Sequence, residues 1–272
     1  MVRSLWTAAT GMIAQQNNVD TIANNLANVN TTGYKTEVNE FKSLLYQNLQ
    51  QKTTTADGSP KPTSAQVGLG VRNASITPIF TQGSLLASEK DTAFAIDGKG
   101  FFSVRGSDGN TYYTRNGNFD WTLGENGSNM LANTDGLPVL DTTGKPIILG
   151  KEYVVSRITV TADGQVCYPD EKNNAQPLGI QIGLTQFNNP AGLERLADSL
   201  YAESAASGQP INEFTSNTVE KSKVIQNYLE GSNVQVVDEM VNMIVAQRAY
   251  EMNSKAITAS DEMMQQANNL RR

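Results

Sequence analysis

The chain has 272 residues, 27 acidic and 21 basic side chains, a formal net charge of −6, one cysteine and no histidine. This acidic balance argues against nucleic-acid binding, because such proteins normally present a basic surface. The absence of histidine excludes catalytic triads and zinc sites that require imidazole, and the single Cys167 excludes an intramolecular disulfide. No stretch approaches the length and apolar character of a membrane-spanning helix.

The first segment, residues 1–34, is predicted to contain a helix at 4–29. Apolar residues recur in it at seven-residue spacing: Leu5, Met12, Val19 and Leu26. The only charged residues up to Gly33 are Arg3 and Asp20, and the polar face consists instead of Asn and Gln. Amides follow the first six residues too soon for the apolar core of a signal peptide, so we expect export, if any, without cleavage.

The second segment, residues 35–71, is predicted to be an extended connection. Its part 47–70 carries Thr53-Thr54-Thr55 and Pro60-Lys61-Pro62 and shows no strong periodicity. Structureless stretches of this length are uncommon in compact domains and usually have a function.

The third segment, residues 72–208, is predicted to form a compact antiparallel β domain. Asp-Gly and Asn-Gly pairs, which favour hairpin turns, alternate with short runs rich in β-branched and aromatic residues. Within this segment the pairs begin at residues 97, 108, 116, 126, 135 and 163, and a further Asp-Gly pair begins at residue 57 in the preceding segment. Residues 209–233 are then expected to return the chain towards its C-terminal end.

The last segment, residues 234–272, is predicted to contain a long helix at 235–270. Its apolar side chains again recur every seven residues: Val236, Met243, Tyr250, Ile257 and Met264. Further apolar residues widen this stripe, among them Val237, Met240, Val241 and Ile244. A stripe this wide cannot be buried against a single partner helix.

The fold class expected is α+β, with the terminal helices paired as a coiled-coil-like domain and the β domain inserted between them. Pairing the two helices alone would leave apolar side chains in water, although burying each is worth about 1.5–3 kcal/mol. The low charge of residues 1–34 therefore favours a structural protein that assembles with further copies of itself. The alternative is a monomer whose helices cover its own β domain.

Two sequence motifs at opposite ends of the chain are similar to signatures of a known family. Residues 23–35 (ANNLANVNTTGYK), together with 229–234 (LEGSNV) and 239–257, resemble the terminal motifs of bacterial flagellar rod and hook proteins. Residues 98–102, 113–119 and 135–136 resemble the β domain of that family, and the segment 121–130 departs from it by a few extra residues. The length favours the distal rod type, because proximal rod subunits are shorter and hook proteins carry a further outer domain.

This resemblance implies a structural subunit of the basal body that spans the periplasm, is exported without a cleaved signal peptide, and has no catalytic, metal-binding or cofactor-binding residues. It would polymerise into a rigid tube that encloses the export channel and transmits torque to the hook. Implied partners are further copies of the chain, proximal rod proteins, the hook or its junction, bushing ring proteins and the type III export apparatus, without nucleic acid or membrane insertion.

Two sets of residues are implied to carry this function. The inner assembly helices would use Leu5, Met12, Val19, Ile22, Asn24, Asn25, Leu26, Asn28, Val29, Val236, Met240, Met243, Ile244, Tyr250, Ile257 and Met264. The segment that keeps the rod straight would use Tyr46, Gln47, Pro60, Pro62, Gly68 and Gly70.

Other readings of individual features are weaker. The Asp-Gly pairs lack the Asp-x-Asp-x-Asp-Gly pattern of calcium loops, and neither Gly68-Leu69-Gly70 nor Gly98-Lys99-Gly100 completes a phosphate-binding motif. Cys167 lacks the histidine that usually activates a catalytic thiol. The rival function is a β-rich secreted enzyme or carbohydrate-binding module with helical flanks, which would need converging carboxylates or exposed aromatic side chains on the β domain.

Overall fold

The computed structural model describes residues 2–50, 65–124, 127–170, 174–216 and 219–270. The chain divides into two compact units, each built from segments far apart in the sequence. The helical unit comprises Met1–Ala27, Glu37–Pro78 and Gln235–Arg272, and the β unit comprises Asn28–Thr36 and Ile79–Val234. The expected α+β class, with one helix near each end of the chain and antiparallel strands between them, is confirmed.

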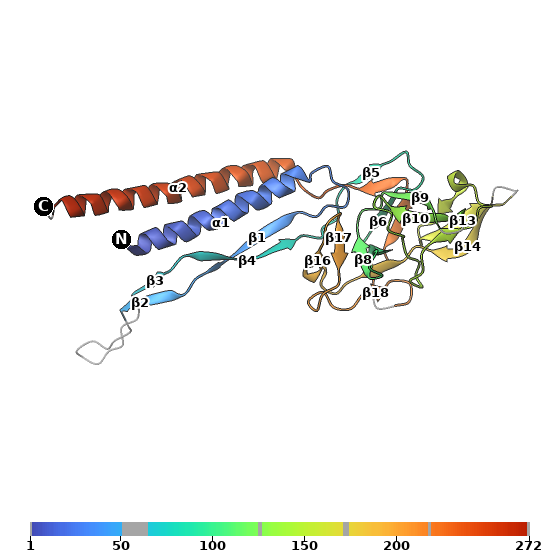
Figure 1. The fold of residues 1–272 in the computed structure, drawn as a ribbon, viewed down its shortest axis with the longest axis horizontal. Coiled ribbons are helices and arrows are strands. Elements are labelled where there is room, and N and C mark those ends of the chain that lie inside the picture. The colour runs from blue at the N-terminus through green and yellow to red at the C-terminus, as the bar shows by residue number, and fades with distance from the viewer. Residues whose placement is uncertain (1, 51–64, 125–126, 171–173, 217–218, 271–272) are drawn as a thin grey trace. The chain divides into compact units, whose positions relative to one another are not determined.

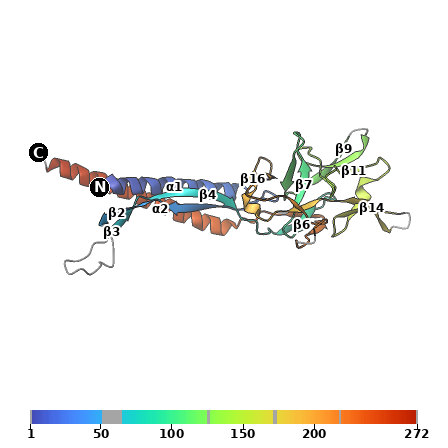
Figure 2. The ribbon, with the colours of Figure 1, turned by 90° about the horizontal axis from the view of Figure 1, so that it is seen from below.

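The helical unit contains helices α1 (Val2–Ala27) and α2 (Val236–Asn269), which lie side by side and run in opposite directions (Figures 1 and 2). Gly11 marks a close approach of the two helices, because a Cβ atom there would lie 2.8 Å from Nδ2 of Asn253. The hydroxyl oxygens of Ser4 and Ser260 lie 3.4 Å apart. Small and polar side chains therefore line part of the helix contact.

A two-stranded ribbon accompanies α1 in the same unit (Figure 1). Strand β1 (Glu37–Ser43) pairs antiparallel with β4 (Val71–Pro78), and a register shift falls between Glu40 and Phe41. Strand β2 (Tyr46–Gln50) pairs with β3 (Ala65–Gly68). The segment 47–70 thus begins and ends in paired strands where an unpaired loop was expected, and Pro60 and Pro62 lie outside the described residues.

The β unit is assembled from antiparallel sheets (Figure 2). The largest has the strand order β16-β17-β8-β7-β15-β18, two three-stranded sheets have the orders β11-β10-β9 and β12-β13-β14, and two pairs are β19-β6 and β20-β5. The strands are β5 Leu85–Ala87, β6 Phe94–Asp97, β7 Phe101–Arg105, β8 Thr111–Thr114, β9 Phe119–Leu123, β10 Asn129–Asn133, β11 Ile148–Leu149, β12 Thr159–Val160, β13 Gln165–Pro169, β14 Ala175–Gln181, β15 Leu184–Gln186, β16 Glu194–Arg195, β17 Leu200–Ala202, β18 Ile211–Asn212, β19 Lys223–Gln226 and β20 Tyr228–Glu230. The described part of the unit also includes the 3-10 helices η2 (Val155–Arg157) and η3 (Pro190–Gly192).

Turn chemistry explains several connections between these strands. Asp108-Gly109 joins β7 to β8 and Asp163-Gly164 joins β12 to β13, with φ of +81° at Gly109 and +76° at Gly164. Glycine adopts such a left-handed backbone at little cost. The expected return connector, 209–233, instead contains strands β18, β19 and β20, because β19 and β20 pair with β6 and β5 from the beginning of the unit.

The interior of the β unit holds two apolar clusters. The larger brings together Phe102 of β7, Phe119 of β9 and Ile182, which directly follows β14, all of them fully buried. The smaller is aromatic: Phe101, Tyr113, Phe187 and Tyr201 pack around Phe80 and one another at ring separations of 4.8–5.9 Å. Cys167 is buried in strand β13. No helix among the described residues has the length and hydropathy needed to cross a membrane.

Candidate assembly surface and its buried anchors

The most unusual surface of the molecule is on α2. Of its described residues, only Glu239, Ala246 and Ser260 are buried. Large apolar side chains along the helix remain exposed: Val236, Val237, Met240, Val241, Ile244, Val245, Tyr250, Met252 and Met263. Val237 alone keeps 73% of its surface in contact with solvent. Contiguous apolar surface of this kind marks an interaction site.

The other elements of the helical unit add to this surface. On α1, Trp6 and Ile13 are 69% and 61% exposed. On the ribbon, exposed apolar side chains include Val38, Phe41, Leu45, Tyr46, Leu49, Leu69 and Ile76. A hollow of about 400 Å³ also lies between the helices, lined by Gln16, Val19 and Gln247 with Tyr250 and Glu251. The helical unit therefore presents apolar side chains on α1, on α2 and on the ribbon.

The residues predicted for assembly fall into several environments. Ile22 and Asn25 are buried, whereas Leu5, Met12, Val19, Leu26, Met243, Ile257 and Met264 are half-buried. Asn24, Val236, Met240, Ile244 and Tyr250 are exposed, and half-buried Asn28 and Val29 belong to the β unit. In the ribbon, Tyr46 and Gln47 are exposed, Gly68 contacts the Tyr46 ring, and Gly70 packs against Thr10 with φ of +116°.

Asn25 joins three elements of the helical unit. Its Nδ2 donates to the backbone oxygen of Glu37, at 2.9 Å, and to Oε1 of Glu239, at 3.3 Å. Its Oδ1 accepts the backbone N–H of Glu37 at 2.9 Å. One buried amide therefore links the end of α1 to the start of β1 and to the first turn of α2.

Glu239 has a perturbed pKa in this arrangement. Burial raises the pKa of the carboxyl, the hydrogen bond from Asn25 lowers it, and the charge of Asp238 raises it again. Because the folded pKa lies above the unfolded value, folding disfavours the ionised form. The contribution of Glu239 to the free energy of unfolding of the helical unit is therefore largest below the pKa of the unfolded chain. It falls as pH rises through the higher pKa of the folded chain.

Glu239→Gln is expected to leave the helical unit at least as stable at neutral pH, with a change of about 1 kcal/mol or less. The glutamine keeps an oxygen for Asn25 but does not ionise, so the fall in stability above pH 4.5 should shrink. Thermal unfolding followed by circular dichroism at several pH values measures both effects. Glu262→Gln is the matched control, since it also neutralises a carboxylate of α2, at an exposed position far along the helix from Glu239, and should leave the pH dependence unchanged. A pH dependence unchanged by Glu239→Gln would contradict this assignment.

The second anchor is a group of buried charges inside the β unit. Glu230 accepts hydrogen bonds from Lys35 Nζ at 2.5 Å and from Arg115 Nη1 at 3.1 Å, and all three side chains are at most 2% exposed. Its Oε1 also accepts the backbone N–H of Gly83 at 3.0 Å. Arg115 Nη2 donates to the backbone oxygen of Gly98 at 2.6 Å. We call Lys35, Arg115 and Glu230 the ion triad.

The surroundings of the ion triad offset the cost of burying its charges. Burial lowers the pKa of Lys35, the Glu230 carboxylate raises it, and the Arg115 guanidinium lowers it again. Lys35 also donates to the backbone oxygen of Thr81 at 2.7 Å, and the guanidinium lies 5.3 Å from the centre of the Phe101 ring. Such a group is sensitive to the loss of one member, because the remaining charges would be left buried and uncompensated.

Asn233 completes the same region of the β unit. Its Oδ1 accepts the backbone N–H and the hydroxyl of Thr36 at 2.7 and 2.8 Å. Its Nδ2 donates to the backbone oxygen of Ile79 and to the hydroxyl of Thr81 at 2.9 and 2.8 Å. The segments around residues 35, 80 and 230 are thus bound together by side-chain hydrogen bonds.

The ion triad and Asn233 are not among the site residues predicted from the sequence. All four lie inside the sequence motifs described above, and Lys35 is the first charged residue after Asp20. A charge that interrupts a long uncharged stretch was the available signal. What the sequence did not contain was the partner of each charge, since the members of the ion triad are separated by 80 to 195 residues.

Family models match three separate parts of the chain. The model described as "Flagella basal body rod protein" matches residues 5–35, "Flagellar hook protein FlgE/F/G D1 domain" matches 95–168, and "Flagellar basal body rod FlgEFG protein C-terminal" matches 225–270. Each matched part supplies one member of the ion triad. The buried charges therefore join the three family segments.

Relatives cover the entire chain. The flagellar basal-body rod protein FlgG of Borreliella burgdorferi is 43% identical over 100% of both chains. FlgG of Buchnera aphidicola subsp. Schizaphis graminum is 40% identical over 99% of this chain and 100% of its own, and FlgG of Bacillus subtilis is 35% identical over 100% of both. This chain belongs to the FlgG family of flagellar distal rod proteins, which are structural components of the basal body and not enzymes.

Proposed function

We propose that the chain polymerises through its helical unit into a rigid helical tube that transmits motor torque to the hook and encloses the export channel. The observation that carries this proposal is the set of large apolar side chains left exposed along α2. Burying each would stabilise a contact by about 1.5–3 kcal/mol, less the part of its surface already covered. In a monomer these side chains remain in water, so this stabilisation is not gained.

The helical unit supports contacts with sibling copies better than contacts with unrelated ligands. The hollow between α1 and α2 is lined by the apolar side chains of Val19 and Tyr250, by two glutamine amides and by the carboxylate of Glu251. Amides both donate and accept hydrogen bonds, so identical faces can satisfy one another. A heterologous contact whose rotation does not close into a ring generates a helical filament.

In the proposed tube, α1 and α2 pair in a coiled-coil-like manner and form the inner layer. The outer layer, predicted from sequence as residues 72–208, would be the β unit, whose main segment is Ile79–Val234. Stiffness comes from buried interfaces that resist bending and twist, so no bond chemistry is required. The subunit would span the periplasm after export without signal cleavage. Proximal rod proteins, the hook or its junction, the bushing rings and the type III export apparatus are its proposed partners.

Assembly of the purified full-length protein tests the proposal. Light scattering should rise above a threshold concentration, and electron microscopy should show straight tubes with density for helices at the inner wall. A chain lacking α1 and α2 should stay in solution at the same concentration. Full-length protein that remained monodisperse under all assembly conditions would contradict the proposal.

We further infer that the segment 47–70 keeps the tube straight by lying between axially neighbouring subunits. Leu45, Tyr46 and Leu49 are 82%, 60% and 57% exposed at the described end of this ribbon, which suits them for contacts with another copy. Deleting part of the segment is expected to leave polymers that are curved or more easily bent, as measured by persistence length in electron micrographs.

The matched control for this deletion replaces the removed residues with a Gly-Ser linker of the same length. If the residues themselves make the contact, the linker should restore length but not stiffness. Polymers that stay equally straight in both variants would refute the role of the segment without affecting the assembly proposal.

A further inference from the structure

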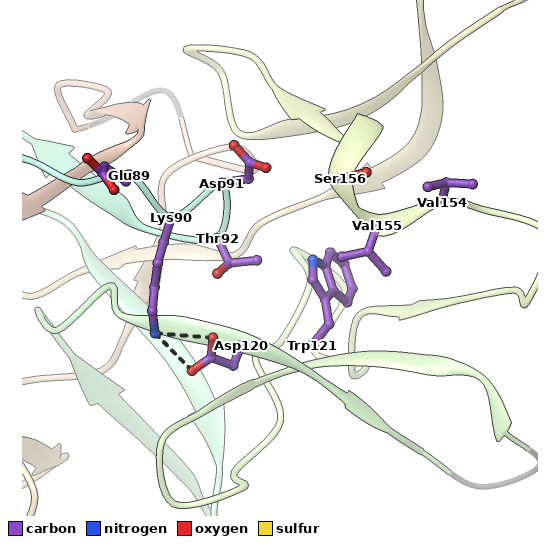
Figure 3. A pocket seen from close by; sticks show the side chains of 9 residues that line it. All are labelled: Glu89, Lys90, Asp91, Thr92, Asp120, Trp121, Val154, Val155 and Ser156. Atoms are coloured by element: carbon purple, nitrogen blue, oxygen red, sulfur yellow. Dashed lines mark hydrogen bonds and ion pairs between the residues drawn. The ribbon is translucent and has the colours of Figure 1, made fainter.

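A groove on the β unit is not used by the proposed assembly. Its first hollow has a volume of about 590 Å³ and lies between the loop 89–92, strand β9 and the residues around η2 (Figure 3). A second hollow of about 390 Å³ shares Asp91 and Ser156 with the first and continues past Ile158 to Gln226. Both volumes fall in the range of small-molecule sites, roughly 300–1,000 Å³.

The walls of this groove are fixed by hydrogen bonds. Gln226 donates through Nε2 to the backbone oxygens of Asp91 and Ile158, at 2.8 and 3.2 Å, and its Oε1 accepts the N–H of Val160 at 2.9 Å. Lys90 Nζ contacts the Asp120 carboxylate and Oδ1 of Asn118, each at 3.3 Å. The loop 89–92 is thus tied both to strand β19 and to β9, so a ligand would meet a site that is already formed.

The side chains that line the first hollow combine one aromatic ring and two valines with oxygen-bearing groups and the ammonium of Lys90. The indole of Trp121 stands between Thr92 and Val155 with its nitrogen turned towards the hollow, and Asp91 and Ser156 lie across from it (Figure 3). Trp121 is only partly buried, and Asp91 and Ser156 are exposed. An indole offers an apolar face and one N–H donor, whereas carboxylates and hydroxyls accept or donate around it.

We propose that this groove binds a neutral polysaccharide chain, with Trp121 as the platform for a sugar ring and Asp91 as an acceptor for its hydroxyl groups. Sugars present apolar C–H faces edged by hydroxyl groups, which matches an aromatic ring edged by carboxylate and hydroxyl oxygens. Two adjoining hollows suit a chain of several rings, and a single lysine or leucine side chain would fill only part of them. The site lies in the β unit and the proposed assembly surface in the helical unit. Sugar binding can therefore be tested independently of polymerisation.

The chain provides its own reporter for this binding. Trp6 and Trp121 are its two tryptophans, so the full-length Trp6→Phe variant emits fluorescence from Trp121 alone. Titration with chitohexaose or cellohexaose, below the concentration for assembly, should change that emission saturably. A response to only one of the two would support the proposal and identify the sugar class.

Substitutions separate binding from folding. Asp91→Asn, at an exposed position, should weaken binding about tenfold, the factor expected when a charge-assisted hydrogen bond becomes a neutral one. Trp121→Ala should abolish binding measured by calorimetry, with strand content checked by circular dichroism. Glu194→Gln, an exposed change on β16 outside both hollows, should leave binding unaltered. Absence of a saturable change with either sugar, equal affinity in Asp91→Asn, or binding of oligolysine but not sugar would each overturn the proposal.

Discussion

Glu230→Gln is expected to destabilise the β unit by about 3–5 kcal/mol, the cost of breaking a buried ion pair by removing one partner. The substitution keeps the shape of the side chain but leaves Lys35 and Arg115 buried beside a neutral amide. Water cannot solvate these two charges in the folded protein, since both side chains are at most 2% exposed. Because total stabilities are commonly about 5–15 kcal/mol, a loss of this size threatens folding at physiological temperature.

Urea unfolding with two probes measures this effect separately in each unit. In the Trp6→Phe background, Trp121 fluorescence reports the β unit, while the ellipticity at 222 nm is dominated by α1 and α2. The β-unit midpoint should fall sharply, whereas Glu194→Gln, an exposed carboxylate on β16, should change stability by no more than about 0.5 kcal/mol. Equal small effects of the two substitutions would show that the ion triad is not an anchor.

A triple variant tests the reason for that loss. Lys35→Met, Arg115→Leu and Glu230→Leu together remove every charge of the triad, and such replacements often recover the stability lost by a single change. Recovery should be incomplete here, because the backbone N–H of Gly83 and the backbone oxygen of Gly98 lose their side-chain partners. Leaving a fully buried group unsatisfied costs about 1–3 kcal/mol, and the cost is smaller here because Gly83 and Gly98 are only half-buried. The triple variant should therefore lie between the single variant and the original chain.

The parts of the fold that were predictable from sequence depend on local chemistry. Both helices follow from long apolar periodicity without internal proline, and α1 and α2 lie within two residues of the predicted helix ends. The turns at Gly109 and Gly164 follow from Asp-Gly pairs that favour a left-handed backbone. These features require no knowledge of distant residues.

The parts that were missed depend on pairing across long separations. Strands β19 and β20 are short and have weak patterns of their own, and they exist because β6 and β5 offer free edges more than 100 residues earlier. The ribbon strands β2 and β3 are mostly exposed on both faces, so no alternation marks them. In the helices, the buried line runs through Ala8, Ala14 and Ala246, whose small size a search for large apolar side chains overlooks.

The same distinction applies to the candidate site. Exposed apolar residues on α2 were recognisable because the stripe was too wide for one partner, an argument that uses only helical spacing. Lys35 and Glu230 were not recognisable, because a charged residue in a sequence is most often a solvated one. Only the fold reveals that each is the partner of the other.

Val241→Asp is expected to abolish polymerisation while leaving the monomer folded. Val241 is 55% exposed and lies on the same face of α2 as Val237, Ile244 and Val245, at helical spacings of three and four residues. In the monomer the new carboxylate would remain in water and cost little. In the proposed tube it would be buried among apolar side chains without a partner, which is a far larger penalty than the loss of one valine contact.

A graded series makes this prediction quantitative. Val241→Ala removes part of the apolar area and should raise the threshold concentration for assembly by about tenfold, which corresponds to roughly 1.4 kcal/mol per subunit. Lys255→Asp is the matched control: it also introduces a carboxylate on α2, at an exposed position that already carries a charge and should therefore stay in water. Sedimentation should show polymer for the control, a raised threshold for alanine and none for Val241→Asp, with equal helix content in all three. If Val241→Asp assembled like the unaltered chain, the exposed stripe of α2 would not be the surface that joins the subunits.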